Sequence, residues 1–139
     1  MGGGRPPLGR LNALDTNVVA RYILRDDPRQ AEIATAILAG PCFLSDTVLI
    51  ELCWLLSSRY RVGRADLVAT LRDLLLLPRL MVSDDALIGW AIDRFAAGAD
   101  FADMMHILSG RHADRFVSFE KRMAVLAGPD TPIPIETPA

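Results

Sequence analysis

The chain has 139 residues, 51% of them hydrophobic, and a formal net charge of -2 at pH 7. This length predicts one domain with a buried core. The charge excludes a protein that holds nucleic acid by bulk positive charge alone. Uncharged apolar runs fall short of the roughly 20 residues that a membrane span needs, so we expect no membrane partner.

The amino end and the cysteines bear on where the protein resides. Met1 to Arg10 contains Gly-Gly-Gly and Pro-Pro and lacks the apolar core of a signal peptide. We expect residues 1–10 to be a disordered lead-in and 11–139 to be a single domain. Cys42 and Cys53 form no metal or redox motif, which predicts two buried thiols in a reducing cytoplasm.

Short apolar runs alternate with segments of helical periodicity along the chain. The expected strands are 11–14, 42–44, 80–82, 115–119 and 132–136. The expected helices are 16–24, 28–39, 46–59, 65–77, 85–97 and 100–112. This alternation predicts an α/β fold with a parallel sheet. Prolines confine the last strand to an edge of a sheet.

Capping residues predict where several helices begin. Asp27 is a candidate N-cap, with Pro28 as the first helical residue and Gln30 as the capping-box partner. Ser45 is a second candidate N-cap. Ser83-Asp84-Asp85 is expected to start a further helix in the same way.

Asp15 follows the first expected strand and precedes the first expected helix. The carboxyl ends of parallel strands are where open α/β sheets bind ligands. A carboxylate followed by the hydroxyl of Thr16 and the amide of Asn17 offers hard oxygen donors. Such donors suit magnesium or manganese better than a softer metal.

Glu51 is the only polar side chain between Val48 and Leu56. A helix that is apolar on nearly all sides is expected to be buried, and a buried carboxylate needs a partner. That partner is either an arginine, such as Arg21 or Arg59, or a metal ion. The sequence leaves both interpretations open.

Asp100 and Asp103 lie three residues apart at the start of one expected helix, so they project towards the same side. Asp100 is readily explained as an N-cap. Asp103 is surrounded by apolar residues and is harder to explain as a cap alone. His106, one turn further on, is more simply a structural histidine than a substrate contact.

Glu120 lies just past an expected strand, as Asp15 does. If those two strands are neighbours, both acids face one crevice. The alternative is a solvated acid paired with Lys121 or Arg122. Ser118 either orients a ligand through its hydroxyl or is a plain strand residue.

Several carboxylates at strand ends and helix starts would repel one another if folding brought them together. One or two divalent cations remove that repulsion, and two-metal sites suit phosphodiester hydrolysis. The candidate acids are Asp15, Glu51, Asp100, Asp103 and Glu120.

Four motifs in this order resemble those of PIN domains, and more narrowly those of VapC-type toxins of bacterial toxin–antitoxin pairs. The matching stretches are Leu14-Asp15-Thr16-Asn17-Val18-Val19, Ser45 to Leu56 around Glu51, Asp100-Phe101-Ala102-Asp103-Met104-Met105 and Val117-Ser118-Phe119-Glu120-Lys121-Arg122. The resemblance implies a three-layer α/β/α sandwich with a small parallel sheet. It also implies an endoribonuclease that uses magnesium or manganese and is toxic until a cognate antitoxin blocks it.

The resemblance also assigns roles to individual residues. Asp15, Glu51 and Asp103 match the three core acids, Asn17 matches a supporting polar residue, and Asp100 matches an auxiliary acid. Glu120 stands where the family more often has aspartate. Its extra methylene places direct metal ligation in question and allows contact through a water.

The resulting hypothesis is a cytoplasmic, magnesium-dependent endoribonuclease that cleaves RNA with a metal-activated water. A catalytically silent PIN-like binding module is one alternative. A phosphatase with an aspartyl nucleophile is a weaker one, because its general acid would stand where this chain has Asn17. Trp54, Leu55 and Leu56 belong either to the core or to a surface for a homodimer or an antitoxin helix.

Overall fold

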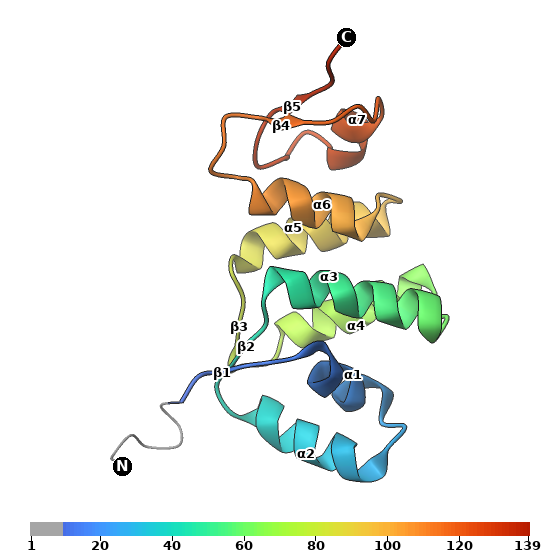
Figure 1. The fold of residues 1–139 in the computed structure, drawn as a ribbon, viewed down its shortest axis with the longest axis vertical. Helices are drawn as coiled ribbons and strands as arrows, with labels where there is room; N and C mark the ends of the chain where they lie inside the picture. The colour runs from blue at the N-terminus through green and yellow to red at the C-terminus, as the bar shows by residue number, and fades with distance from the viewer. Residues whose placement is uncertain (1–9) are drawn as a thin grey trace. The chain divides into compact units, whose positions relative to one another are not determined.

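A computed structural model describes residues 10–139, which fall into two compact units (Figure 1). The first unit ends at Ser83, and the second spans Asp84–Ala139. The lead-in predicted for residues 1–10 lies outside the described residues except for Arg10. Among residues 10–139, no helix is long and apolar enough to cross a membrane.

The first unit contains a parallel sheet of three short strands, in the order β1-β2-β3. Asn12 lies opposite Cys42, and Cys42 lies opposite Leu80. The elements are β1 (Asn12–Ala13), α1 (Thr16–Leu24), α2 (Pro28–Ala39), β2 (Cys42–Phe43), α3 (Asp46–Trp54), η2 (Leu55–Arg59), α4 (Arg64–Leu75) and β3 (Leu80–Met81). Because β1 and β2 are parallel, α1 and α3 both begin at the carboxyl edge of the sheet.

The second unit contains three helices and a separate pair of strands. Its elements are α5 (Asp85–Ala96), α6 (Phe101–Ser109), β4 (Phe116–Val117), α7 (Met123–Ala127) and β5 (Ile135–Glu136). Helix α5 packs on α6, and Phe95 meets Phe101 edge to face with ring centroids 5.7 Å apart. Strand β5 runs parallel to β4 and has only this partner among the described strands, which confirms the edge position predicted from its prolines.

The predicted helix starts are confirmed by side-chain caps. Asp27 accepts a hydrogen bond from the backbone amide of Gln30 at 3.1 Å, and Ser45 accepts one from Val48 at 3.2 Å. The Gln30 side chain makes no return bond to Asp27 among the described residues, so the predicted capping box is wrong in that part. Asp84 caps α5 in the same way. These caps depend on residues three apart in the chain, so the local sequence specifies them.

Helix ends differ more from the prediction. Helix α4 ends at Leu75, because the amide of Leu77 bonds to the carbonyl of Leu74 three residues back and tightens the last turn. Helix α6 ends at Ser109 with Gly110 as its cap, about one turn before the predicted end. The predicted helix 46–59 changes at Leu55 into a π-helical turn, closed by a hydrogen bond from the Tyr60 amide to the Leu55 carbonyl.

Gly128 provides a test of the second unit. Its φ is +79° with ψ near 180°, a region open almost only to glycine. A β-carbon there would lie 3.0 Å from Cζ of Arg94, whose Nε donates to the Leu126 carbonyl. We expect Gly128→Ala to lower the free energy of unfolding by about 1–3 kcal/mol.

Gly89 is the matched control for this change. It lies inside α5, and a β-carbon there would meet no atom within 4 Å. Gly89→Ala should therefore raise the free energy of unfolding by about 0.5–1 kcal/mol. Urea denaturation of both variants measures the two effects. Equal stability of the two variants would contradict the conformation assigned to Gly128.

Candidate active site

Asp15 is placed by its local role as the N-cap of α1. Its carboxylate accepts a hydrogen bond from the Thr16 amide at 2.9 Å, and the side chain is exposed. Only Leu14 separates Asp15 from the end of β1. The carboxylate therefore lies at the carboxyl edge of the sheet, as predicted.

Glu51 is joined to this edge through Thr16. The Thr16 hydroxyl donates a hydrogen bond to Oε1 of Glu51, from α1 to α3. Thr16 is only 4% exposed and is the one buried polar residue among those described. Since α1 and α3 also pack on each other, Asp15 and Glu51 stand on either side of the same buried threonine.

The burial predicted for Glu51 is wrong. Glu51 is exposed, and Trp54, one turn later, is 65% exposed. These two residues share a face of α3 that points away from the core, although the sequence of the helix is largely apolar. Composition alone does not determine which face of a nearly uniform helix is covered, because its amphipathic signal is weak.

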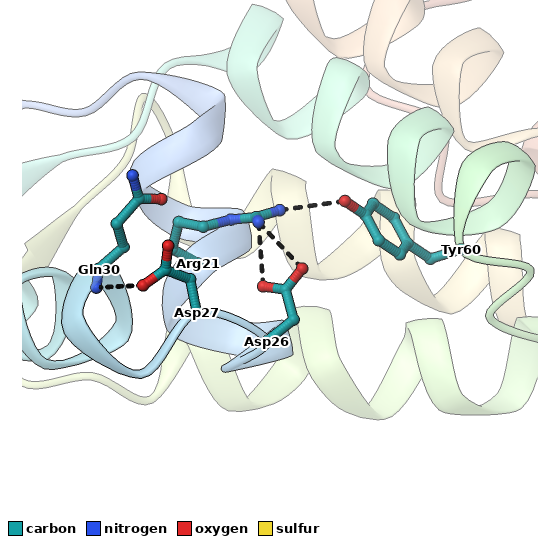
Figure 2. Close-up of polar contacts among 5 residues, drawn as sticks. All are labelled: Arg21, Asp26, Asp27, Gln30 and Tyr60. Carbon is teal, nitrogen blue, oxygen red and sulfur yellow. Dashed lines mark hydrogen bonds and ion pairs between the residues drawn. The ribbon is translucent and has the colours of Figure 1, made fainter.

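The arginine partner considered for Glu51 is also not found. Arg21 instead bonds to Asp26 at 3.0 Å and to the Tyr60 hydroxyl at 3.1 Å (Figure 2). The Tyr60 hydrogen bond raises the pKa of Arg21, and Asp26 adds to this against the opposing effect of burial. Within residues 10–139 no ion pair joins Glu51 to Arg59. Thr16 is therefore the partner that Glu51 has.

The second unit gathers the other three acids. Asp100 caps α6 by accepting a hydrogen bond from the Asp103 amide at 2.9 Å. Burial raises the pKa of Asp103, the charge of Asp100 raises it further, and Glu120 adds to the rise, while His106 opposes it. Asp100 and Glu120 are thus both close enough to Asp103 to repel its charge.

Glu120 and Ser118 form a tight turn after β4. The Ser118 hydroxyl accepts a hydrogen bond from the Glu120 amide at 3.1 Å. Oε1 of Glu120 accepts one from the Arg122 amide at 2.9 Å, so its partner is the backbone of Arg122 and not a side-chain cation. The exposed Glu120 carboxylate is held in a defined position by these two bonds.

The predicted acids thus fall into two sets, one in each unit. Asp15 and Glu51 belong to the first unit, and Asp100, Asp103 and Glu120 belong to the second. Within the described part of the chain, no group of three or more His, Cys, Asp or Glu is arranged to hold a metal ion. Strand β1 pairs with β2 and β4 pairs with β5, so the neighbouring strands considered for Asp15 and Glu120 are not among the described pairs.

The chemistry of both sets nevertheless suits a hard divalent cation. Every donor is a carboxylate oxygen, which magnesium and manganese prefer. Burial and the charges of Asp100 and Glu120 raise the pKa of Asp103 against the effect of His106, and a cation would favour the ionised carboxylate instead. These residues therefore fit the ion that the sequence predicted.

Two features of the site region were not predicted from the sequence. Thr16 was recognised as a neighbour of Asp15, but not as the link to Glu51, 35 residues away. The contact of Arg21 with Tyr60 spans 39 residues and has no local signature. Cys42 and Cys53 are buried as expected, and burial raises the pKa of Cys42.

Comparison with known proteins identifies one family. A family model described as PIN domain matches residues 13–129, a span that runs through both units. No curated protein and no solved structure gives a significant match. The family match, the seven α-helices and the parallel strands of the described residues confirm the predicted PIN-like α/β/α fold class.

The raised pKa of Asp103 makes a prediction about stability and pH. Its folded pKa lies above the unfolded value of about 3.9, so the folded state loses stability as pH rises from that value through the folded pKa. Without metal, Asp103→Asn should therefore raise Tm at pH 7 and give no gain at about pH 3. Thermal unfolding in a chelator at several pH values measures this.

Asp66→Asn is the matched control, because Asp66 occupies the same third position of α4 that Asp103 occupies in α6. Both changes remove the same favourable interaction with a helix dipole. The difference between the two variants thus isolates what raises the pKa of Asp103, which is its burial first and then the charges of Asp100 and Glu120. A Tm for Asp103→Asn at or below that of Asp66→Asn at pH 7 would show that the charge of Asp103 does not destabilise the metal-free fold.

Proposed function

Because the chain belongs to the PIN domain family, whose members are generally metal-dependent nucleases, we propose that it is a magnesium- or manganese-dependent endoribonuclease. The observation that carries the proposal is that each acid matching a PIN motif lies beside another one. Thr16 joins Asp15 to Glu51 in the first unit. In the second unit, Asp103 lies close enough to Asp100 and Glu120 for their charges to raise its pKa.

In this proposal Asp15, Glu51 and Asp103 bind the metal, and Asp100 and Glu120 assist them. Asn17 and Ser118 support the site. A divalent cation bound by such acids acts as a Lewis acid and makes water a nucleophile at neutral pH. The hydrolysed bond is a phosphodiester of RNA.

The residues of the chain contribute orientation and charge. The Thr16 hydroxyl holds the Glu51 carboxylate, and the Thr16 backbone amide holds that of Asp15. Neither carboxylate therefore has to be ordered when substrate arrives. Asp103 carries unfavourable charge in the metal-free protein. Binding a cation at Asp103 would convert that repulsion into attraction.

The finer part of the proposal is that the protein is the toxin of a toxin–antitoxin pair and works in the cytoplasm. It rests on the resemblance of the four motifs to VapC-type toxins. The chain also exposes large apolar side chains that a cognate antitoxin or a second copy in a homodimer could cover. Trp54 is 65% exposed and Phe119 is 84% exposed, whereas Leu56 is buried in the core.

The first test replaces a proposed metal ligand without disturbing its helix. Asn caps a helix about as well as Asp, so Asp15→Asn should retain the fold. We expect magnesium-dependent cleavage of single-stranded RNA to fall by on the order of 100-fold or more, since outer partners of metal ligands alone are worth about 10- to 100-fold. A chelator should abolish cleavage by the unchanged protein.

Asp27→Asn is the matched control, because Asp27 caps α2 as Asp15 caps α1 and has no proposed catalytic role. It should cleave as the unchanged protein does. Undiminished cleavage by Asp15→Asn, or by the unchanged protein in chelator, would refute the proposal. If manganese titration of the unchanged protein detects no binding, the catalytically silent binding module is favoured instead.

The toxin proposal has its own test. Expression of the chain in a bacterium should arrest growth, and Asp15→Asn should relieve the arrest because it removes a metal ligand. A short reading frame immediately upstream that encodes a small DNA-binding protein would supply the antitoxin, and its co-expression should restore growth. Growth unaffected by the active chain would contradict the toxin assignment while leaving the nuclease assay to decide the activity.

A further inference from the structure

A hollow of about 310 Å³ lies between α1 and α2 in the first unit. Its size is at the lower end of the range of small-molecule sites, about 300–1,000 Å³, and suits a compact ligand. Its lining comes from Asn17, Val18 and Arg21 of α1 and from Gln30, Ile33, Ala34 and Ile37 of α2. We call it the α1–α2 pocket.

The pocket combines an apolar wall with two amide side chains. Val18, Ile33 and Ile37 supply the apolar surface, and Ile33 is 51% exposed. The amides of Asn17 and Gln30 make no side-chain hydrogen bond to any residue in the described range 10–139. Each amide therefore offers both a donor and an acceptor to a ligand.

Arg21 contributes to the pocket in a different way. Figure 2 shows its guanidinium directed away from Gln30, towards Asp26 and Tyr60, to which it is bonded. The part of Arg21 left for the pocket is its aliphatic stem, which is apolar. The fixed guanidinium also anchors the α1 side of the pocket to Asp26, in the connection between α1 and α2, and to Tyr60, the residue after η2.

The position of the pocket relates it to the proposed nuclease site. Asn17 lies two residues after Asp15, in the first turn of the same helix. A ligand that reaches Asn17 thus approaches the carboxylates that Thr16 holds together. This continuity favours an occupant that belongs to the nucleic-acid substrate.

We propose that the α1–α2 pocket binds one unstacked base of the RNA, close to the phosphate that is cleaved. A base has a flat apolar face and an edge of adjacent donors and acceptors. Proteins read single-stranded RNA by packing such faces and hydrogen-bonding such edges, and amide side chains pair with a base edge through two bonds. Gln30 is thus a specificity residue that touches substrate without taking part in the chemistry.

This inference rests on the proposed nuclease function, and binding can be measured apart from cleavage. The probes are single-stranded RNA tetranucleotides of A, C, G or U, and an abasic tetranucleotide of the same charge. They are titrated into the full chain in a chelator, with the side-chain amide signals of Asn17 and Gln30 followed by nuclear magnetic resonance. At least one base-containing probe should shift these signals, and the abasic probe should not.

The variant Gln30→Leu keeps an aliphatic side chain of similar bulk and removes the donor and acceptor of the amide. The best probe should bind to it roughly 5- to 150-fold more weakly, the range that corresponds to about 1–3 kcal/mol for a two-bond amide–base contact. Glu32→Leu, also exposed on α2 but outside the pocket, is the matched control and should bind that probe at least as tightly as the unchanged protein.

Several outcomes overturn the pocket assignment. They are equal affinity for abasic and base-containing probes, unchanged affinity in Gln30→Leu, and amide signals that respond to a peptide from a partner protein but not to RNA. If the chain cleaves RNA and Gln30→Leu cleaves every sequence at the original rate, the pocket assignment fails and the nuclease proposal stands. If the probes bind through Gln30 but no metal supports cleavage, the pocket assignment stands and the nuclease proposal fails.

Discussion

One hydrogen bond, from the buried hydroxyl of Thr16 to Glu51, holds together the acidic edge of the first unit. It joins the start of α1 to the middle of α3. Thr16 also donates its amide to Asp15, so one residue orients two carboxylates through two different groups. Since Thr16 is buried, its hydroxyl has little competition from water, and the position of the pair is set before any ligand arrives.

In the second unit, carboxylates that lie close together destabilise the metal-free fold. Asp103 is half-buried and sits near Asp100 and Glu120, with only His106 opposing their effect on its pKa. An arrangement that destabilises the metal-free fold is typical of a functional site, because stability alone would select against it. The same feature that weakens the fold at neutral pH would strengthen the binding of a cation.

Helix α1 connects this chemistry to the surface beside it. Asp15 caps the helix, Asn17 reaches the α1–α2 pocket, and Arg21 is fixed by Asp26 and Tyr60 (Figure 2). A single rigid element thus carries the acid, the amide and the anchored arginine at fixed spacings. Sites built on such elements keep their geometry better than sites on loops.

The sequence by itself determined the α/β class, the helix starts, the position of Asp15 after the first strand and the role of Asp100 as a cap, because these depend on residues within three or four positions of one another. Tertiary structure alone decided that Glu51 and Trp54 face outward, that Thr16 is the partner of Glu51 and that Arg21 turns to Tyr60. Those outcomes depend on which helix faces cover one another. A nearly uniform apolar helix carries too little amphipathic contrast to specify that choice in advance.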